Sequence, residues 1–600
     1  MEFEQKAEEK KMSMSKNIAR LAVTAGLTAA LSFGGVMAPV TMAFADGVPT
    51  VAKSGNVTIN EQTYTDTTFK GIQIFKAKVT QDLEGANNWN GAKTLSDIEW
   101  ASNAVRDAVT GAFADTSDTT KPSDNDAQKW ADWLKSKTEG EYESGTDKTT
   151  KLDAGKTLDK IAKALEDANI TEGTDECKTS TGGAFTGLNT GYWLFVTKDV
   201  NTSANPPKRN TDTFTSPIFA VVGGSDETIA PKKQVPTVTK AVKDDAKGST
   251  FGAPGEPNKA ADSQMDDYVD YLLTGTVAGN INTYSTYKYT FTDNLPKSMT
   301  PKFKDNSTTP DVTVKIGDTE VKTDCYAAKY ENDTITVDFT NLKNCTDVKG
   351  TAISLNSDSK VTVEYKAKLD STKIFDNGKI KNEFDGLVGK AQKNMVTLTY
   401  SKNPHAKGVG TTVEHLAYDY TYGIEVTKVG SDDKAKGLEG VEFTLQENGD
   451  TSSFIKADGT KTADREQAKL KTDANGKINV VGLDEGTYTL TEVTPKPGYN
   501  NSAAGGVTFT IKRSLNQTGD DVTPSTESVI KAADGVVQDN NATAATGKLS
   551  FTIVDQKGTG LPLTGLNGVT FTWIAGGAVL CIGVAHLIRS RKQAEESEQE

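Results

Sequence analysis

The sequence contains few of the residues on which metal binding and histidine catalysis depend. Only three histidines occur among 600 residues, and the four cysteines have no metal-ligand spacing. This scarcity argues against zinc chemistry and histidine-based catalysis, so we expect no enzyme, no cofactor and no metal. Cys325 and Cys345 lie close in the sequence and could form a disulfide in an oxidising exterior.

Basic residues are outnumbered by acidic ones. The chain has 67 Lys and Arg against 81 Asp and Glu, which gives a net charge of −14. No basic stripe is available to neutralise phosphates, so nucleic acid is not an expected partner. The length exceeds what one hydrophobic core usually serves, and it predicts three or four domains.

The N-terminal region has the pattern of a signal peptide. Residues 21–45 are apolar and follow Lys16 and Arg20, and a small-x-small sequence ends at Ala45. Residues 1–45 are therefore predicted to be removed on export. Because the first eleven residues are acid-rich, Met12 and Met14 both remain open as the true start.

The C-terminal forty residues combine three features. A pentapeptide comes first, an apolar run over 566–588 is long enough to cross a bilayer as a helix, and basic residues follow it. Together residues 561–600 resemble the sorting signal that a sortase recognises in Gram-positive surface proteins. This resemblance implies cleavage between the fourth and fifth residues of the motif, Leu561, Pro562, Leu563, Thr564 and Gly565.

The exported part divides into three blocks, residues 46–231, 232–404 and 421–557. Short alternating segments separated by Gly, Asn and Asp turns predict tandem immunoglobulin-like β-sandwiches, a mainly β fold. The first block also has apolar residues at three- and four-residue spacing over 97–113 and 158–168, which predicts added helices.

Polar side chains occupy apolar strand faces in the second and third blocks. Strand side chains alternate between the two faces, so each of these residues shares its face with hydrophobic neighbours. Burying such groups unpaired would cost several kcal/mol each. The second block contributes Lys240, Asp293 and Asn394, and the third contributes Lys428, Glu492 and Asp555.

A covalent pairing would satisfy these groups. Burial lowers the pKa of a lysine and raises that of a carboxylic acid, so a neutral amine can attack an amide or acid beside it. We predict a Lys240–Asn394 bond assisted by Asp293, formed with loss of ammonia. We likewise predict a Lys428–Asp555 bond assisted by Glu492, formed with loss of water. Asn382 is an alternative to Asn394, and ordinary salt bridges are the alternative to both bonds.

Particular stretches of these blocks resemble pilin domains. Residues 235–240, 289–296 and 394–401 resemble the isopeptide-forming middle domain of Gram-positive backbone pilins. Residues 426–428 and the E-box stretch 488–499 resemble a collagen-adhesin B-type domain, a family that commonly has Asn where Asp555 stands. The first block resembles the N-terminal domain of the same pilins through residues 192–195 and 216–219. Thr197 stands there where an E-box glutamate would be, so no isopeptide bond is predicted in this block.

Residues 229–236 are similar to the pilin motif that supplies a polymerisation lysine. By its position after the proline, Lys232 is the match, and Lys233 is the alternative. Prolines on both sides keep the segment extended. The resemblance implies that a pilin sortase attacks Thr564 and that Lys232 of another copy resolves the acyl-enzyme.

The resemblance thus implies a secreted, covalent homopolymer that a housekeeping sortase attaches to peptidoglycan, as a surface pilus on the cell wall. The predicted function of this chain is to form the shaft of that pilus as its repeating subunit. A monomeric wall-anchored adhesin that binds a host surface ligand is the alternative, and Lys232 distinguishes the two because only a shaft subunit needs this lysine.

Overall fold

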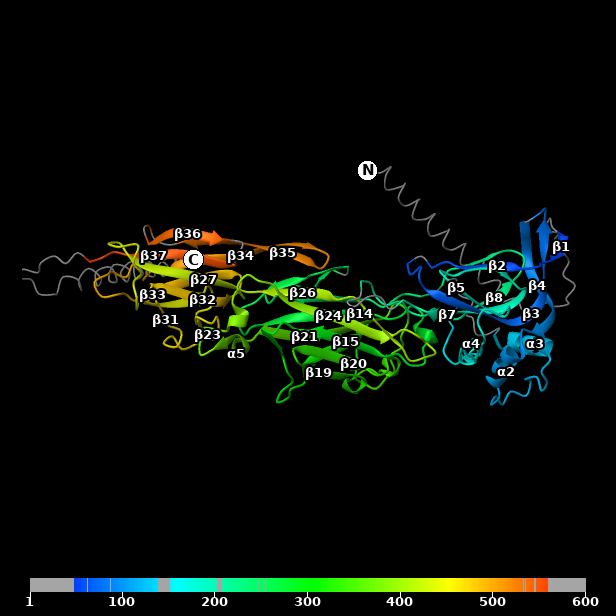
Figure 1. Cartoon of the computed structure of the whole chain (residues 1–600). Coiled ribbons are helices and arrows are strands. Elements are labelled where there is room, and N and C mark those ends of the chain that lie inside the picture. The colour runs from blue at the N-terminus through cyan, green and yellow to red at the C-terminus, as the bar shows by residue number, and fades with distance from the viewer. Residues whose placement is uncertain are drawn as a thin grey trace, which may run out of the picture.

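The computed structural model describes residues 48–558 except 62, 87, 139–151, 202–207, 232, 247, 254, 532–533, 535 and 544–546. The predicted signal peptide, sorting signal and polymerisation lysine Lys232 lie outside these described residues. The described chain is mainly β, as predicted, and forms three domains that follow one another in a row from blue through green to orange (Figure 1). No helix among the described residues combines the length and apolar character needed to cross a membrane.

The first domain is built on a long central strand, β3 (Thr68–Glu84), with neighbours on both sides. Its larger sheet has the order β1-β3-β7-β8, with β4 and β5 also paired to β3, and its smaller sheet has the order β6-β2-β9. The bounds are β1 (Val48–Val51), β2 (Gly55–Ile59), β4 (Asn88–Trp100), β5 (Cys177–Thr181), β6 (Ala184–Leu188), β7 (Gly191–Asp199), β8 (Ile218–Val222) and β9 (Glu227–Ile229).

Three helices lie on one side of this domain (Figure 1): α2 (Asn103–Gly111), α3 (Ala127–Thr138) and α4 (Thr157–Asp167). The helix predicted over 158–168 corresponds to α4. The helix predicted from residue 97 begins later, because β4 continues to Trp100 and the side chain of Ser102 caps α2 by accepting the N–H of Val105. Helix α3 was not predicted, although it buries Trp130 and Trp133 in the core.

The middle domain is a sandwich of two sheets. One has the order β10-β14-β21-β17-β18 with β16 on β21, and the other has the order β13-β26-β24-β15-β20-β19 with β25 on β24. The bounds of the first sheet are β10 (Val238–Lys243), β14 (Tyr268–Thr276), β16 (Met299–Pro301), β17 (Val312–Ile316), β18 (Thr319–Glu320) and β21 (Lys360–Leu369). Those of the second are β13 (Ala260–Asp262), β15 (Tyr289–Asn294), β19 (Ala327–Glu331), β20 (Thr334–Phe339), β24 (Gln392–Ser401), β25 (Val409–Thr411) and β26 (His415–Tyr420).

Strands β25 and β26 lie beyond residue 404, where the sequence block was expected to end, and they pair with β24 of this sandwich. Short elements complete the domain. They are β11 (Gly252–Ala253), β12 (Glu256–Pro257), β22 (Phe375–Asp376), β23 (Lys379–Ile380), α5 (Ser371–Ile374) and the 3-10 helices η1 (Ile281–Thr283), η2 (Thr323–Cys325), η3 (Leu342–Asn344) and η4 (Asn382–Phe384).

The third domain is a second sandwich, in which a four-stranded sheet β32-β27-β37-β36 faces a sheet β30-β29-β28-β33-β34-β35 with β31 on β28. Its first strand β27 and last strand β37 are parallel neighbours. The bounds are β27 (Tyr422–Gly430), β28 (Glu442–Glu447), β29 (Phe454–Ile455), β30 (Lys461–Thr462), β31 (Leu470–Lys471), β32 (Lys477–Leu483), β33 (Gly486–Thr494), β34 (Val507–Thr518), β35 (Asp521–Lys531), β36 (Val537–Thr543) and β37 (Lys548–Asp555).

Ion pairs join consecutive domains. His405 of the middle domain lies 2.7 Å from Asp159 and 3.1 Å from Glu166 on α4 of the first. Although burial opposes the charged ring, these two carboxylates raise the pKa of His405 to about 9, so it is charged at neutral pH. At the other junction Arg513 on β34 lies 3.2 Å from both Asp244 and Asp262 of the middle domain.

Candidate isopeptide sites

Lys240 lies in the core of the middle domain, facing an acid on the opposite sheet. Because side chains alternate along β10, Lys240 points inward with Val238 and Val242, and all three are fully buried. Its Nζ lies 2.6 Å from both carboxylate oxygens of Asp293 on β15. Asn394 on β24, which pairs with β15, is also fully buried. The predicted lysine, acid and amide are therefore all in one core.

A tyrosine connects the three groups. The hydroxyl of Tyr365 on β21 donates to Oδ2 of Asp293 at 2.8 Å and accepts from Nδ2 of Asn394 at 2.8 Å. Lys240 Nζ donates to the same hydroxyl at 3.2 Å. The Oδ1 atom of Asn394 has no hydrogen-bond partner among the described residues. Tyr365 thus holds the amide of Asn394, the predicted acceptor, in the neighbourhood of the amine and the acid.

Sequence reasoning missed Tyr365, although a signal was present. Val361, Val363, Tyr365 and Ala367 alternate along β21, so the tyrosine shares the inward face. An inward tyrosine is commonly a core residue, and alternation alone does not reveal that its hydroxyl reaches three polar groups.

Burial moves the middle-domain pair toward its neutral state. Removal from water lowers the pKa of Lys240 to about 8 against the opposing effect of Asp293. Burial also raises the pKa of Asp293, although Lys240 and Tyr365 partly offset this. A neutral amine next to a protonated acid is the combination that amide formation requires.

The competing acceptor Asn382 has a different environment. It is exposed on the 3-10 helix η4, whereas Asn394 lies in the core and shares the hydroxyl of Tyr365 with Asp293. The geometry therefore favours Asn394 as the acceptor.

Replacing Tyr365 tests how this site is organised. Tyr365→Phe keeps the buried ring and removes only the hydroxyl, so we expect the fraction of chains with a linked Lys240 to fall about tenfold at early times after synthesis. Mass spectrometry of freshly produced protein measures that fraction. Tyr289→Phe is the matched control, because its hydroxyl donates to the carbonyl of Thr276 instead. Equal linkage in both variants would contradict a role for Tyr365.

The third domain holds a lysine between two acids. Lys428 Nζ lies 2.8 Å from Oε2 of Glu492 on β33 and 2.5 Å from Oδ1 of Asp555 on β37. None of the three side chains is exposed to solvent. The lysine and Asp555 are on the parallel first and last strands, and Glu492 reaches them from the facing sheet. Asp555 also accepts the backbone N–H of Ser502 at 3.0 Å.

The pKa of Glu492 is raised to about 7, mainly by burial. Lys428 opposes this rise, and the neighbouring Asp555 adds to it. An acid with a pKa near neutrality can both give and take a proton, which suits the assisting role predicted for it. Lys428 also lies over the ring of Phe443, with 5.7 Å from Nζ to the ring centroid. Lys240 lies similarly over Tyr271, at 5.1 Å.

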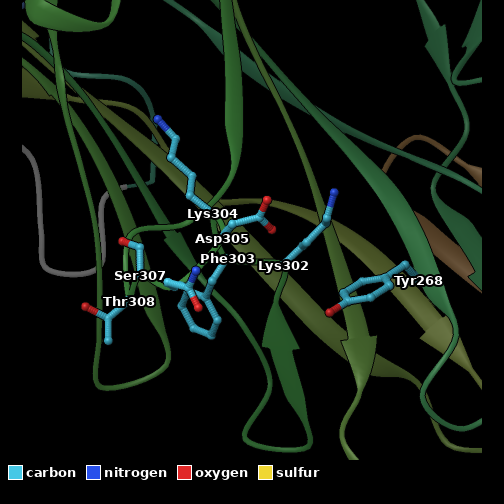
Figure 2. A pocket seen from close by; sticks show the side chains of 8 residues that line it. Tyr268, Lys302, Phe303, Lys304, Asp305, Ser307 and Thr308 are labelled. Carbon is cyan, nitrogen blue, oxygen red and sulfur yellow. The ribbon is translucent and has the colours of Figure 1, made fainter.

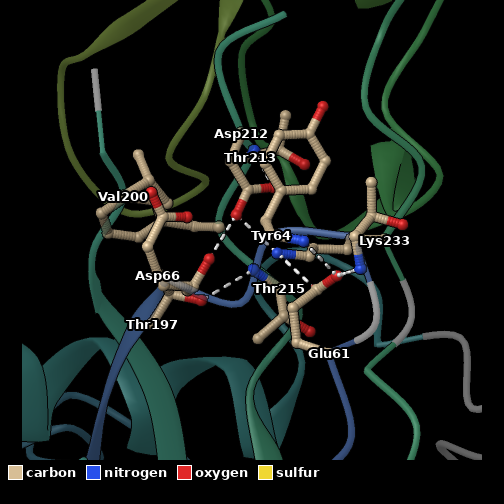
Figure 3. A network of polar contacts seen from close by, with 12 residues as sticks. Glu61, Tyr64, Asp66, Thr197, Val200, Asp212, Thr213, Thr215 and Lys233 are labelled. Atoms are coloured by element: carbon tan, nitrogen blue, oxygen red, sulfur yellow. Dashed lines mark hydrogen bonds and ion pairs between the residues drawn. The ribbon is translucent and has the colours of Figure 1, made fainter. Parts of the chain in front are cut away.

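The two candidates for the polymerisation lysine differ in what the structure describes. Lys232 is outside the described residues. Lys233 has a side chain that is only 4% exposed, and its Nζ lies between Glu61 and Asp212 of the first domain (Figure 3). An amine held in this way is not free to enter the active site of another protein.

The structure contains Cys325 and Cys345 as free thiols, so the disulfide considered from the sequence is absent from it. Thr346 donates its backbone N–H to Sγ of Cys325 at 3.3 Å. Burial and the neighbouring Cys325 raise the pKa of Cys345 to about 12, which keeps that thiol protonated.

A surface hollow of about 870 Å³ lies on the middle domain, and none of the candidate lysines lines it (Figure 2). It is lined by Tyr268, Lys302, Phe303, Lys304, Asp305, Asn306, Ser307 and Thr308. It contains no histidine or cysteine. Across the described part of the chain, no group of three or more His, Cys, Asp or Glu side chains is placed to hold a metal ion.

Comparison with known proteins gives one family match, in the third domain. Residues 422–524 match the family "SpaA: Prealbumin-like fold domain". No curated protein matches the chain.

Among solved structures, the chain is similar to the T6 backbone pilin of Streptococcus pyogenes, with 14% identity, 84% of this chain and 98% of that chain covered and a TM-score of 0.44. It is also similar to the major pilin SpaD of Corynebacterium diphtheriae, with 14% identity, 85% of this chain and 98% of that chain covered and a TM-score of 0.40. A third similar structure is the major pilin subunit BcpA of Bacillus cereus, with 16% identity, 63% of this chain and 89% of that chain covered and a TM-score of 0.35.

Proposed function

We propose that this chain is the shaft subunit of a Gram-positive surface pilus, in which copies are joined covalently and two sandwiches are locked by internal amide bonds. The observation that carries the proposal is the pair of buried lysines, Lys240 and Lys428, each held against a buried acid with an acceptor side chain in the same core. The protein acts as a sortase substrate and structural element, and it is not an enzyme.

In the middle domain the neutral amine of Lys240 attacks the side-chain carbonyl carbon of Asn394. Asp293 transfers protons and the amide nitrogen leaves as ammonia. In the third domain Lys428 attacks Asp555, Glu492 transfers protons and water leaves. Both sites are preassembled by folding, so proximity supplies a high effective concentration and each domain reacts once.

The position of these sites suits a fibre under tension. A sortase would join Thr564 of one copy to Lys232 of the next, so load would enter before β10 and leave after β37. Each proposed bond lies between an early and a late strand of its sandwich and closes a loop of more than a hundred residues. Force between those strands would then meet a covalent bond rather than a ladder of hydrogen bonds.

The mass of the exported chain tests the internal bonds. We expect these two bonds to lower the mass by about 35 Da relative to that calculated for the exported residues, from one ammonia and one water, and any further amide bond to lower it by about 18 Da more. Relative to the mass calculated for each variant, the deficit should shrink by about 17 Da in Asp293→Ala and by about 18 Da in Glu492→Ala, and the other bond should be unaffected in each. A chain with the full unmodified mass would refute the proposal for both domains.

The proposed assembly requires a pilin sortase, further copies of the chain and, for anchoring, a housekeeping sortase and peptidoglycan. It places the protein outside the cell, attached to the wall.

A further inference from the structure

Another lysine with a sequestered amine lies between two acids at the end of the first domain. Lys233 Nζ lies 2.7 Å from Oε2 of Glu61 and 2.6 Å from Oδ2 of Asp212 (Figure 3). The exposed fractions of the three side chains are 4%, 6% and 1%. One lysine between two sequestered acids is also the composition of the Lys428 site. The amine lies 5.2 Å from the ring centroid of Tyr64, just as Lys240 and Lys428 lie over aromatic rings.

The topology around Lys233 matches that of the third domain. Glu61 comes just after β2 and Lys233 just after β9, and these two strands are parallel neighbours. Lys428 and Asp555 likewise lie on two parallel neighbouring strands, β27 and β37, which are the first and last strands of the third domain. A bond between Glu61 and Lys233 would therefore close the first domain as the proposed Lys428 bond closes the third.

We propose that Lys233 and Glu61 form a third intramolecular amide bond, with Asp212 carrying the proton. The inference rests on the amide chemistry of the proposed function, and it adds a modification site in a domain where the sequence predicted none.

Glu61 is held as an acceptor. Its Oε1 accepts the backbone N–H groups of Thr63 at 2.9 Å and Tyr64 at 3.0 Å, while Oε2 faces Lys233. Two backbone donors on one oxygen stabilise the negative charge that develops there when an amine adds to the carbon. Asp555 of the third domain also accepts a backbone N–H, from Ser502.

Asp212 is placed to move the proton. Its Oδ2 accepts from Lys233 and from the hydroxyl of Thr67 at 2.6 Å, and Oδ1 accepts the N–H of Thr213 at 2.8 Å. Burial raises the pKa of Asp212, although Lys233 and the hydrogen bonds partly offset it. A carboxylate that protonates readily is suited to take a proton from the lysine and return it.

The reaction balances with these three groups alone. One proton of the Lys233 ammonium passes to Asp212, and the amine adds to the carboxyl carbon of Glu61. The C–N bond forms and the C–Oε2 bond breaks. The departing oxygen takes one proton from Asp212 and one from the nitrogen and leaves as water, so Asp212 is regenerated.

The sequence predicted no bond here because Thr197 stands at the position of an E-box glutamate. In the structure Thr197 accepts the N–H of Thr215 in this same network (Figure 3). The acids come instead from the segments around residues 61 and 212, which are far apart in the sequence. The bond would fasten Lys232, the neighbouring residue, to the core of the first domain.

Peptide mapping of the full exported chain, taken from cells without the pilin sortase, tests the bond. Trypsin cuts after an unmodified lysine but not after an amide-linked one. With the bond present, residues 54–70 remain covalently joined to 233–243, or to 233–240 if Lys240 is unlinked, and the joined mass is about 18 Da, one water, below the sum of the two peptides. Residues 394–402 are attached to the same fragment through Lys240 if the middle-domain bond has formed.

The digest separates failure of this inference from failure of the proposed function. Residues 234–243 attached to 394–402 but not to 54–70 would refute the Lys233 bond and leave the middle-domain bond standing. Release of residues 234–240 as a free peptide would show that Lys240 is unlinked. Attachment of residues 210–232 in place of 54–70 would overturn Glu61 as the acceptor.

Two variants test the role of Asp212. Asp212→Asn keeps the shape of the side chain and removes its proton transfer, so the joined fraction should fall at least about tenfold. Glu227→Gln is the control, since it breaks the 2.5 Å Lys93–Glu227 ion pair in the same domain, which shares no residue with the ion pairs of Lys233. It should leave the joined fraction unchanged. Equal joining in the two variants would rule out Asp212 as the proton carrier.

Discussion

The variant Glu492→Ala is expected to lose the bond of the third domain and much of that domain's stability. A cross-link that closes more than a hundred residues restricts the unfolded chain and contributes about 4–5 kcal/mol, by analogy with disulfides. For a domain of this size the loss corresponds to roughly 15–20 °C in Tm. Calorimetry of the purified chain measures the shift, and trypsin should then cleave the third domain readily. A variant that keeps the wild-type resistance to trypsin would refute the role of Glu492.

The loss of a buried acid could lower stability without any bond, so a second variant is needed. Asp555→Asn changes the leaving group from water to ammonia but gives the same Lys428 amide as product. Its linked form is chemically identical to the linked wild type, and we expect the same mass and the same Tm. Asp555→Ala removes the acceptor and should behave like Glu492→Ala. If Asp555→Ala, which cannot form the bond, kept the wild-type Tm, the bond would not be the source of stability.

The variant Lys232→Ala is expected to abolish the polymer. In the proposed assembly the ε-amine of Lys232 is the group that releases Thr564 from the sortase, and without it no second copy can be added. Cell-wall extracts boiled in detergent should show a ladder of high-molecular-weight species for the wild type and a single species for the variant. Lys232→Arg should also lose the ladder, because a guanidinium keeps the charge but is a poor nucleophile at neutral pH.

Lys233→Ala is the matched control for this experiment. The amine of Lys233 is occupied by Glu61 and Asp212, so its loss should leave the ladder in place. A ladder that survives Lys232→Ala and disappears in Lys233→Ala would move the linkage by one residue. A wild-type wall extract that contains only the single species would favour the monomeric adhesin.

The sequence by itself determined which side chains are buried. Strand alternation has a period of two, so Lys240 and Lys428 had to share a face with hydrophobic residues wherever their strands lay. The same reasoning placed Asp293, Asn394, Glu492 and Asp555 in the cores, and the structure has all six there. The strand and turn pattern also sufficed for a mainly β fold in several domains.

Only the tertiary structure decided which buried groups meet. Alternation assigns a residue to a face, but which strands pair and which sheets face each other depends on contacts between segments far apart in the chain. Tyr365 reaches Lys240 from another strand for this reason, and Asp212 and Glu61 meet Lys233 from loops that have no alternation to interpret. The sequence analysis predicted no bond in the first domain because Thr197 occupies the position of the expected glutamate. Folding instead brings acids to Lys233 from two other segments, those of Glu61 and Asp212.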